Sequence, residues 1–235
     1  MSQGPDPRLI RVSSAHDFEY HVLSEATRSE GATLRELMHD PFYELIDKQY
    51  DRCVIDYCLI APDFPYRGIR SHREAVLFAM LKIIERYLED QRASEEKFAE
   101  GIRDDFFPWN LDFGKARAHQ INPQEFLFVP TVVRTIKGGS VIYDRKDPDV
   151  DAGEQIPYWY AFLEPPQWFD ATPDDFRRIN DALFPEGTDA LEVYEWTTDW
   201  SNCFDAGHEW WGTACWSIYD MHLNRFAVLF ASATD

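Results

Sequence analysis

Four side chains that could perform acid, base or metal chemistry lie close together near the C-terminus. Asp199, Asp205, His208 and Glu209 all fall within the segment DWSNCFDAGHE. Carboxylates beside an imidazole are typical of a general acid and base pair, or of a hydrated divalent-metal site. Their spacing matches neither the H-E-x-x-H motif nor a calcium-binding EF-hand loop. A hydrolase that uses Asp205, His208 and Glu209 is therefore an alternative and not the leading expectation.

Tryptophan residues surround the same segment. The chain has eight Trp, and five of them are Trp196, Trp200, Trp210, Trp211 and Trp216. Trp196 and Trp216 are expected in mid-strand and in the core, whereas the other three flank the loop and are expected to be exposed. Exposed Trp beside carboxylates is typical of a protein interface, because Trp anchors binding energy. Two other interpretations remain open: the indoles fill the core, or they stack on a sugar ring.

These residues together predict a binding site at the rim of a sheet. The predicted contact residues are Asp199, Trp200, Asp205, Glu209, Trp210 and Trp211. No catalytic residue is assigned with them unless the hydrolase alternative holds.

The loop should be held by antiparallel strands. Residues 191–197, 212–219 and 225–232 are rich in β-branched and aromatic residues, and a short turn at 220–224 joins the last two segments. This pattern predicts three consecutive strands, with the polar loop at one end of their sheet.

Helices are expected before this sheet. Thr33 with Glu36 resembles a capping box, and Asp40 followed by Pro41 predicts the start of a second helix toward Tyr50. A long central helix is predicted after Ser71, with a nearly all-apolar middle at 75–81. The run at 53–60 fits either a strand or the end of a helix.

The character of the sequence changes after Pro108. Strands are predicted at 126–135, 140–144 and 158–163, and one helix is predicted from Thr172 to about Leu183. We therefore expect an α+β fold, with a mostly antiparallel sheet in the C-terminal half packed against N-terminal helices. The chain is treated as a single α+β domain over 1–235, helical at 33–107 and sheet-rich at 124–235, with helices on one face of the sheet.

The charge of the chain limits its partners. The formal net charge is −19, and residues 144–235 hold 19 acidic and 5 basic residues, which accounts for −14 of it. Such a surface repels nucleic acid and anionic lipid and attracts basic proteins. The alternative is that the negative charge only keeps the protein in solution. We therefore expect a basic protein partner, no nucleic acid and no membrane.

Several classes of function have no support in the sequence. There is no phosphate-binding glycine loop, and Ser201 and Ser217 lack a nucleophile elbow. The four Cys have neither zinc-site nor redox-pair spacing and are expected to be free thiols, so we predict no metal and no cofactor. With no signal peptide pattern and no long apolar run, a cytoplasmic location is expected. The oligomeric state is not predicted.

The leading hypothesis is a non-catalytic binding protein for a basic protein partner, in the manner of a toxin-neutralising immunity protein. It follows from the charge, from the expected exposure of Trp beside carboxylates, and from the lack of a recognisable catalytic set.

Overall fold

The structure of the 235-residue chain is a computed structural model. It describes residues 9–12, 33–97, 109–129, 135–137, 140–142, 155–166, 171–209 and 211–233. For 9–12, 91–97, 135–137 and 140–142 the backbone alone is described.

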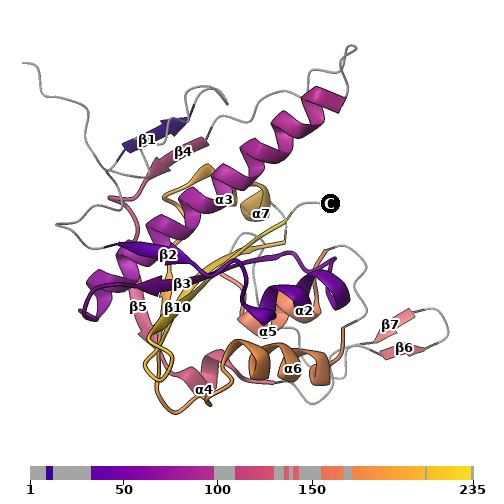
Figure 1. The fold of residues 1–235 in the computed structure, drawn as a ribbon. Coiled ribbons are helices and arrows are strands. Elements are labelled where there is room, and N and C mark those ends of the chain that lie inside the picture. Colours follow the sequence, from indigo (N-terminus) through magenta and orange to yellow (C-terminus); the bar gives the residue numbers. More distant parts are fainter. Residues whose placement is uncertain are drawn as a thin grey trace, which may run out of the picture.

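A six-stranded antiparallel sheet forms the centre of the fold (Figure 1). Its spatial order is β2-β3-β10-β9-β8-β5. The strands are β2 (Leu34–Glu36), β3 (Ile55–Pro62), β5 (Ala118–Ile121), β8 (Leu191–Trp196), β9 (Thr213–Asp220) and β10 (Arg225–Ser232). The prediction of an α+β fold with a mostly antiparallel sheet in the C-terminal half is confirmed, including the three consecutive strands that end the chain.

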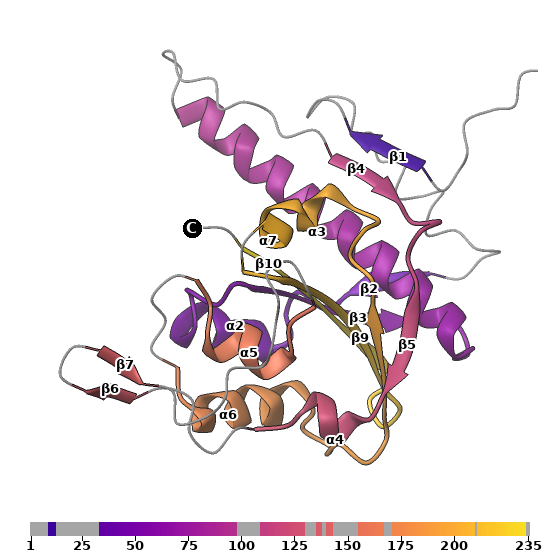
Figure 2. The ribbon, with the colours of Figure 1, turned by 180° about the vertical axis from the view of Figure 1, so that it is seen from behind.

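Helices cover both faces of this sheet (Figures 1 and 2). The long helix α3 (Ile69–Lys97) lies across one face, and α2 (Pro41–Gln49), α5 (Tyr158–Leu163) and α6 (Pro173–Leu183) lie on the other. Each face has its own apolar core, and every residue of β9 is buried. The expectation of helices on one face was therefore wrong, because the side chains of β9 and β10 are buried on both faces of the sheet.

Two small sheets and three short helical elements complete the described fold. A two-stranded sheet pairs β1 (Leu9–Val12) with β4 (Trp109–Asp112), and a hairpin pairs β6 (Thr135–Lys137) with β7 (Ser140–Ile142). The short helical elements are α4 (Pro123–Phe126), η1 (Asn202–Phe204) and α7 (Asp205–Glu209). No described helix combines the length and the apolar character needed to cross a lipid bilayer.

Two helix starts follow the sequence signals closely. The Asp40 side chain accepts a hydrogen bond from the Phe42 amide at 3.0 Å, with Pro41 in the first turn of α2. Thr172 and Asp175 form a complete capping box at the start of α6. In both cases a polar side chain satisfies a backbone amide that has no partner within the helix.

Three element predictions were wrong. The segment after Thr33 forms strand β2 and not a helix, since it pairs with β3 through Leu34 and Pro62. Residues 158–163 form helix α5, in which five of the six side chains are buried in the second core. The run 126–135 does not begin as the predicted strand, since Phe126 ends helix α4, which is capped by Asn122, and residues 127–129 form no strand. Residues 130–134 of that run lie outside the described residues, and Thr135 begins strand β6. In these segments tertiary packing, and not the local composition, determines whether the chain forms a strand or a helix.

The start of the central helix also differs from the prediction. Helix α3 begins at Ile69, so Ser71 is not its N-cap; the Ser71 hydroxyl instead accepts a hydrogen bond from the Arg67 amide at 3.0 Å. The predicted apolar middle is confirmed, since Ala75, Val76 and Ala79 to Leu81 are all fully buried.

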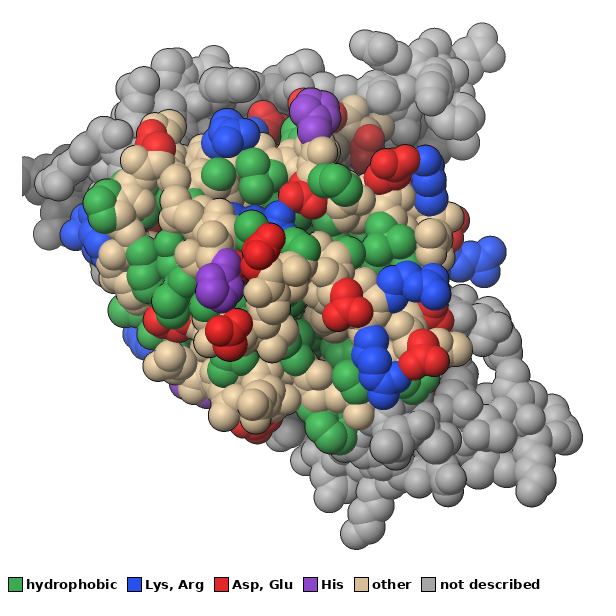
Figure 3. Space-filling model, turned by 60° about the horizontal axis from the view of Figure 1, so that its bottom comes forward, with side chains coloured by type: hydrophobic (Ala, Val, Ile, Leu, Met, Phe, Trp, Pro, Cys, Tyr) green, Lys and Arg blue, Asp and Glu red, His purple; other side chains and the backbone are tan. Residues whose placement is uncertain are grey.

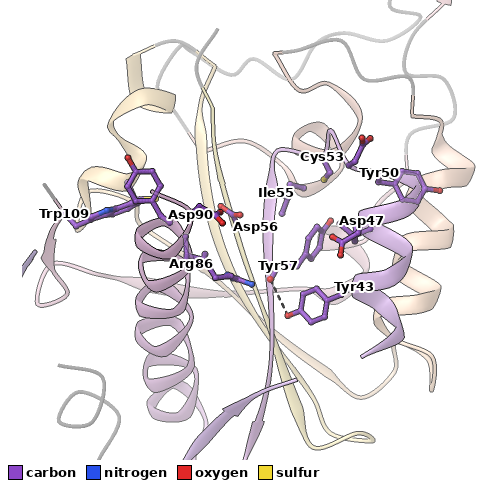
Figure 4. A pocket seen from close by; sticks show the side chains of 15 residues that line it. Tyr43, Asp47, Tyr50, Cys53, Ile55, Asp56, Tyr57, Arg86, Asp90 and Trp109 are labelled. Carbon is purple, nitrogen blue, oxygen red and sulfur yellow. Dashed lines mark hydrogen bonds between the residues drawn. The ribbon is translucent and has the colours of Figure 1, made fainter. Parts of the chain in front are cut away.

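Strand β2 is much shorter than its neighbour β3. Glu36 at its end lies opposite Ile60, and the chain then turns through Asp40 into α2. Residues 55–58 of β3 therefore continue beyond the end of β2, with α2 and α3 on either side (Figure 4). This shortened edge leaves the space in which the candidate site lies.

Candidate functional site

The loop predicted to carry the site folds into η1 and α7 at one end of the sheet. Its three carboxylates are at the surface as expected, since Asp199, Asp205 and Glu209 are all exposed. The loop is joined to β4, because the Asp112 amide donates to the Trp200 carbonyl at 2.7 Å.

The predicted exposure of the indoles was wrong at two positions. Trp200 is 1% exposed and packs on Phe113 and Phe204, with ring centroids 5.0 and 5.5 Å away. Its Nε1 donates to the Thr197 carbonyl at 2.5 Å. Trp211 is 8% exposed, and its Nε1 donates to the Glu164 carbonyl at 2.9 Å. A backbone acceptor within reach makes it possible to bury each indole, including its polar nitrogen.

Trp210, the third indole of the predicted rim, lies outside the described residues. Trp196 and Trp216 are buried at 1% exposure each, as predicted. Among the described residues, the predicted rim therefore keeps its carboxylates and loses its aromatic anchors.

The alternative catalytic set is not assembled around a shared cavity that the structure describes. His208 is half-buried, and its Nε2 lies 3.1 Å from the Thr198 hydroxyl, while Asp205 and Glu209 are exposed. Within the described ranges, no group of three or more His, Cys, Asp and Glu side chains is arranged to hold a metal ion. None of these three side chains lines the pocket described below.

The two serines considered as nucleophiles have structural contacts. Ser201 is buried, and its hydroxyl accepts from the Cys203 amide at 3.1 Å. Ser217 is fully buried and accepts from Trp196 Nε1 at 2.8 Å, while its Oγ lies 2.8 Å from Nδ1 of His72. Neither hydroxyl reaches solvent where a substrate could approach, so these contacts indicate packing rather than nucleophilic catalysis.

A pocket of about 510 Å³ lies between α2, α3 and the part of β3 that extends past β2 (Figure 4). Its volume is within the range of roughly 300–1,000 Å³ that is typical of ligand sites. The lining residues are Tyr43, Ile46, Asp47, Tyr50, Asp51, Cys53, Ile55, Asp56, Tyr57, Ile83, Arg86, Tyr87, Asp90, Trp109 and Cys203.

The pocket is strongly acidic. Four of its lining residues are Asp and one is Arg. Asp47 lies on α2 and Asp51 just after it, Asp56 lies on β3 and Asp90 on α3. Figure 4 shows Asp47 and Asp90 on opposite walls of the pocket. None of the four carboxylates accepts a hydrogen bond from a described residue. The charge of Arg86 is shared with Glu36, whose Oε1 lies 3.2 Å from Arg86 Nη1.

Asp56 has the most unusual surroundings of the four. Asp56 is exposed toward the pocket, while protein atoms surround its carboxylate on the other sides. Burial raises the pKa of Asp56, because the surrounding protein solvates its charge less well than water does. The Arg86 guanidinium opposes this rise. The ionised form of Asp56 is therefore under-solvated and would gain from a cation.

Aromatic rings form much of the remaining wall. Tyr87 is 39% exposed and meets the buried Trp109 edge to face, with centroids 5.5 Å apart. Tyr43 contributes its ring, and its hydroxyl accepts from the Leu59 amide at 2.7 Å at the edge of β3. Aromatic faces attract ammonium and guanidinium groups, and the effect adds to that of nearby carboxylates.

The pocket also contains two free thiols. Cys53 on the α2 side and Cys203 from η1 are both half-buried. Burial raises the pKa of each to about 12, so both are protonated at neutral pH. A protonated thiol is a weak nucleophile, and these residues therefore contribute packing rather than reactivity.

This pocket was not predicted from the sequence, although one signal was present. Asp56 is the only charged residue in the apolar run CVIDYCLI. A carboxylate inside a buried strand requires either a partner or an opening to water, and here it faces a cavity. Of the predicted loop, only Cys203 reaches this site.

On the face shown in Figure 3, acidic and basic side chains are interspersed among apolar ones, so charge alone marks no docking surface on that face. The pocket is a more specific feature, because it joins carboxylates, aromatic faces and a cavity.

Comparison of the chain with protein-family models, with curated proteins and with solved structures finds no match in any of the three.

Proposed function

We propose that this protein is a non-catalytic binding protein that holds a basic protein partner by seating lysine or arginine side chains in the pocket between α2 and α3. The proposal keeps the basic partner expected from the charge of the chain and moves the contact from the loop at 199–209 to the pocket.

The observation that carries the proposal is the set of four pocket carboxylates without a hydrogen bond from a described residue. Asp56 adds weight, because burial raises its pKa and an arriving cation would compensate the poor solvation of its charge. The overall charge of −19 would steer a basic partner toward the molecule over a longer range.

The walls of the pocket suit the cations of a protein. Lysine and arginine each present an aliphatic stem and a charged end. Ile46, Ile55 and Ile83 can contact the stem, while Tyr87 and Trp109 offer ring surfaces near the charge. A cavity of about 510 Å³ exceeds the volume of one side chain, so a segment with neighbouring basic residues fits better than an isolated residue.

Binding is better supported than catalysis. Both pocket thiols are protonated at neutral pH, and the described lining residues include no histidine that could act as a base. The hydrolase alternative would need Asp205, His208 and Glu209 to act together, and none of these residues lines the pocket.

Calorimetry with a short arginine-rich peptide tests the proposal. The reference peptide carries citrulline in place of each arginine, because citrulline has nearly the same shape and no charge. We expect the arginine peptide to bind and the citrulline peptide not to bind, with affinity that falls as salt is added.

A matched pair of variants locates the contact. Asp56→Asn with Asp90→Asn removes two charges from the pocket, and Asp199→Asn with Asp205→Asn removes two from the exposed loop. The pocket variant should lose about tenfold in affinity, whereas the loop variant should change much less. Equal losses in both variants, or no binding by the unmodified protein, would overturn the proposal.

A further inference from the structure

Arg86 is the one basic side chain among the described lining residues of the pocket. It extends from α3 toward the first half of β3, where Asp56 also lines the cavity (Figure 4). A cation in this position could neutralise Asp56 itself and compete with any incoming lysine or arginine. Its actual partner therefore decides how acidic the pocket remains.

The partner of Arg86 in the structure is Glu36, at the end of β2. Arg86 Nη1 lies 3.2 Å from Glu36 Oε1, and the Glu36 side chain is only 5% exposed. The Cys58 thiol donates to the same Glu36 oxygen at 3.5 Å. Burial of the carboxylate strengthens the attraction between the two charges, because water screens it less.

Strand geometry explains why Arg86 has a choice of partner. Glu36 lies opposite Ile60 in the pairing of β2 with β3, and opposite residues share a face of a sheet. Asp56 is four residues before Ile60 on β3, so it shares that face. Glu36 and Asp56 therefore both face α3, where Arg86 begins.

Arg86 is close enough to Asp56 to influence it without pairing with it. The guanidinium lowers the pKa of Asp56 against the effect of burial, yet no ion pair joins these two described residues. The arginine side chain is 36% exposed, so it has room to change partner.

We propose that Glu36 controls the cation affinity of the pocket by holding Arg86 away from Asp56. The inference rests on the proposed function and adds a regulatory element to the same site. When Glu36 loses its charge, Arg86 turns to Asp56 and becomes an internal competitor of the basic partner. Glu36 is thus a positioning residue that acts on binding through Arg86.

A double-mutant cycle tests this arrangement. The four proteins are the unmodified chain, Glu36→Gln, Arg86→Met and the double variant, each measured with the arginine-rich peptide. Glu36→Gln should weaken binding about tenfold, and Arg86→Met should strengthen it, because the internal competitor is gone. In the Arg86→Met background, Glu36→Gln should change affinity by about twofold or less, which is the effect of one distant charge. Equal weakening in both backgrounds would overturn the inference.

A second measurement works without any ligand. Carbonyl-detected NMR titration reports the pKa of Asp56 in each of the four proteins. In Glu36→Gln the pKa of Asp56 should fall, because a paired guanidinium favours the carboxylate; with Met at position 86 the Glu36 change should leave it nearly constant. If Asp56 does not respond to Glu36→Gln, the inference fails even where the peptide binds. If no peptide binds but Asp56 responds, the proposed function fails and the control of Arg86 by Glu36 stands. Thermal unfolding of each variant verifies that all four proteins fold.

Discussion

His72 on α3 and Ser217 on β9 are 145 residues apart in sequence, and Nδ1 of His72 lies 2.8 Å from Oγ of Ser217. The other ring nitrogen, Nε2, lies 2.9 Å from the Tyr66 hydroxyl. His72 is fully buried, so this contact ties the central helix to the middle of the sheet at a site without solvent.

Acid should therefore destabilise the protein through His72. Burial lowers the pKa of His72 from 6.5 to about 3, so the unfolded chain takes up a proton that the folded chain excludes. The stability contributed by neutral His72 is complete above pH 6.5, and it is lost as the pH falls from 6.5 toward 3, by up to about 1.4 kcal/mol per unit.

In the variant His72→Gln, the free energy of unfolding should fall less steeply between pH 6.5 and pH 3. Urea unfolding followed by circular dichroism at several pH values in this range measures it. At neutral pH the same variant should lose about 1–3 kcal/mol, because a buried partner is left without its hydrogen bond. His39→Gln, at an exposed position, is the control. If the free energy of unfolding falls equally steeply with acid in both variants, His72 is not the cause of the loss.

Asp56→Asn should stabilise the protein at neutral pH while it weakens cation binding. The pKa of Asp56 is raised above 3.8 in the folded state, so its favourable contribution is present below pH 3.8 and is lost as the pH rises through the folded-state value. Asparagine removes the cost of the ionised form. Because water reaches the side chain, we expect a gain below about 1 kcal/mol, seen as a rise of about 2–4 °C or less in Tm.

The gain from Asp56→Asn should disappear below pH 3.8, where the wild-type carboxyl is protonated in both states. Asp199→Asn, which removes the same charge from an exposed position outside the pocket, is the matched control. If the two variants stabilise the protein equally, the effect belongs to net charge and not to the surroundings of Asp56.

Local signals in the sequence were sufficient to predict a helix start or a strand where the signal lies within the segment itself. The caps at Asp40 and Thr172 and the strands β8, β9 and β10 are of this kind. The helix α5 was not predictable in this way, because its aromatic composition favours a strand and only burial in the second core selects the helix.

The candidate site was even less accessible to sequence reasoning. Its walls come from α2, β3, α3, β4 and η1, and no local pattern brings Asp56, Arg86 and Trp109 together. The error about Trp200 and Trp211 has the same origin. Their position beside a polar loop suggested exposure, but carbonyl groups of Thr197 and Glu164 allow the indoles to be buried.

Trp200→Ala should reduce stability and leave the binding site intact. The indole is 1% exposed and is held by Phe113, Phe204 and the Thr197 carbonyl. Truncation of a buried Trp typically costs about 3–5 kcal/mol. Urea unfolding measures the loss, and calorimetry with the arginine-rich peptide below the unfolding transition measures binding. A small loss of stability together with a large loss of affinity would make Trp200 a contact residue after all.

Gly207→Ala should destabilise the loop that carries η1 and α7. A Cβ atom at this buried position overlaps the Gly212 carbonyl oxygen and lies 2.7 Å from Cγ2 of Thr213. The Gly207 carbonyl also accepts from the Gly212 amide at 2.8 Å, so the two backbone segments cannot separate without losing that bond. Such overpacking typically costs about 1–3 kcal/mol. Ala206→Ser, at an exposed neighbouring position, should stay within about 0.5 kcal/mol. Hydrogen exchange of the Gly212 amide provides a local readout, and its protection should fall in Gly207→Ala alone; unchanged protection would mean that the loop accommodates the methyl group and that the close approach is not required.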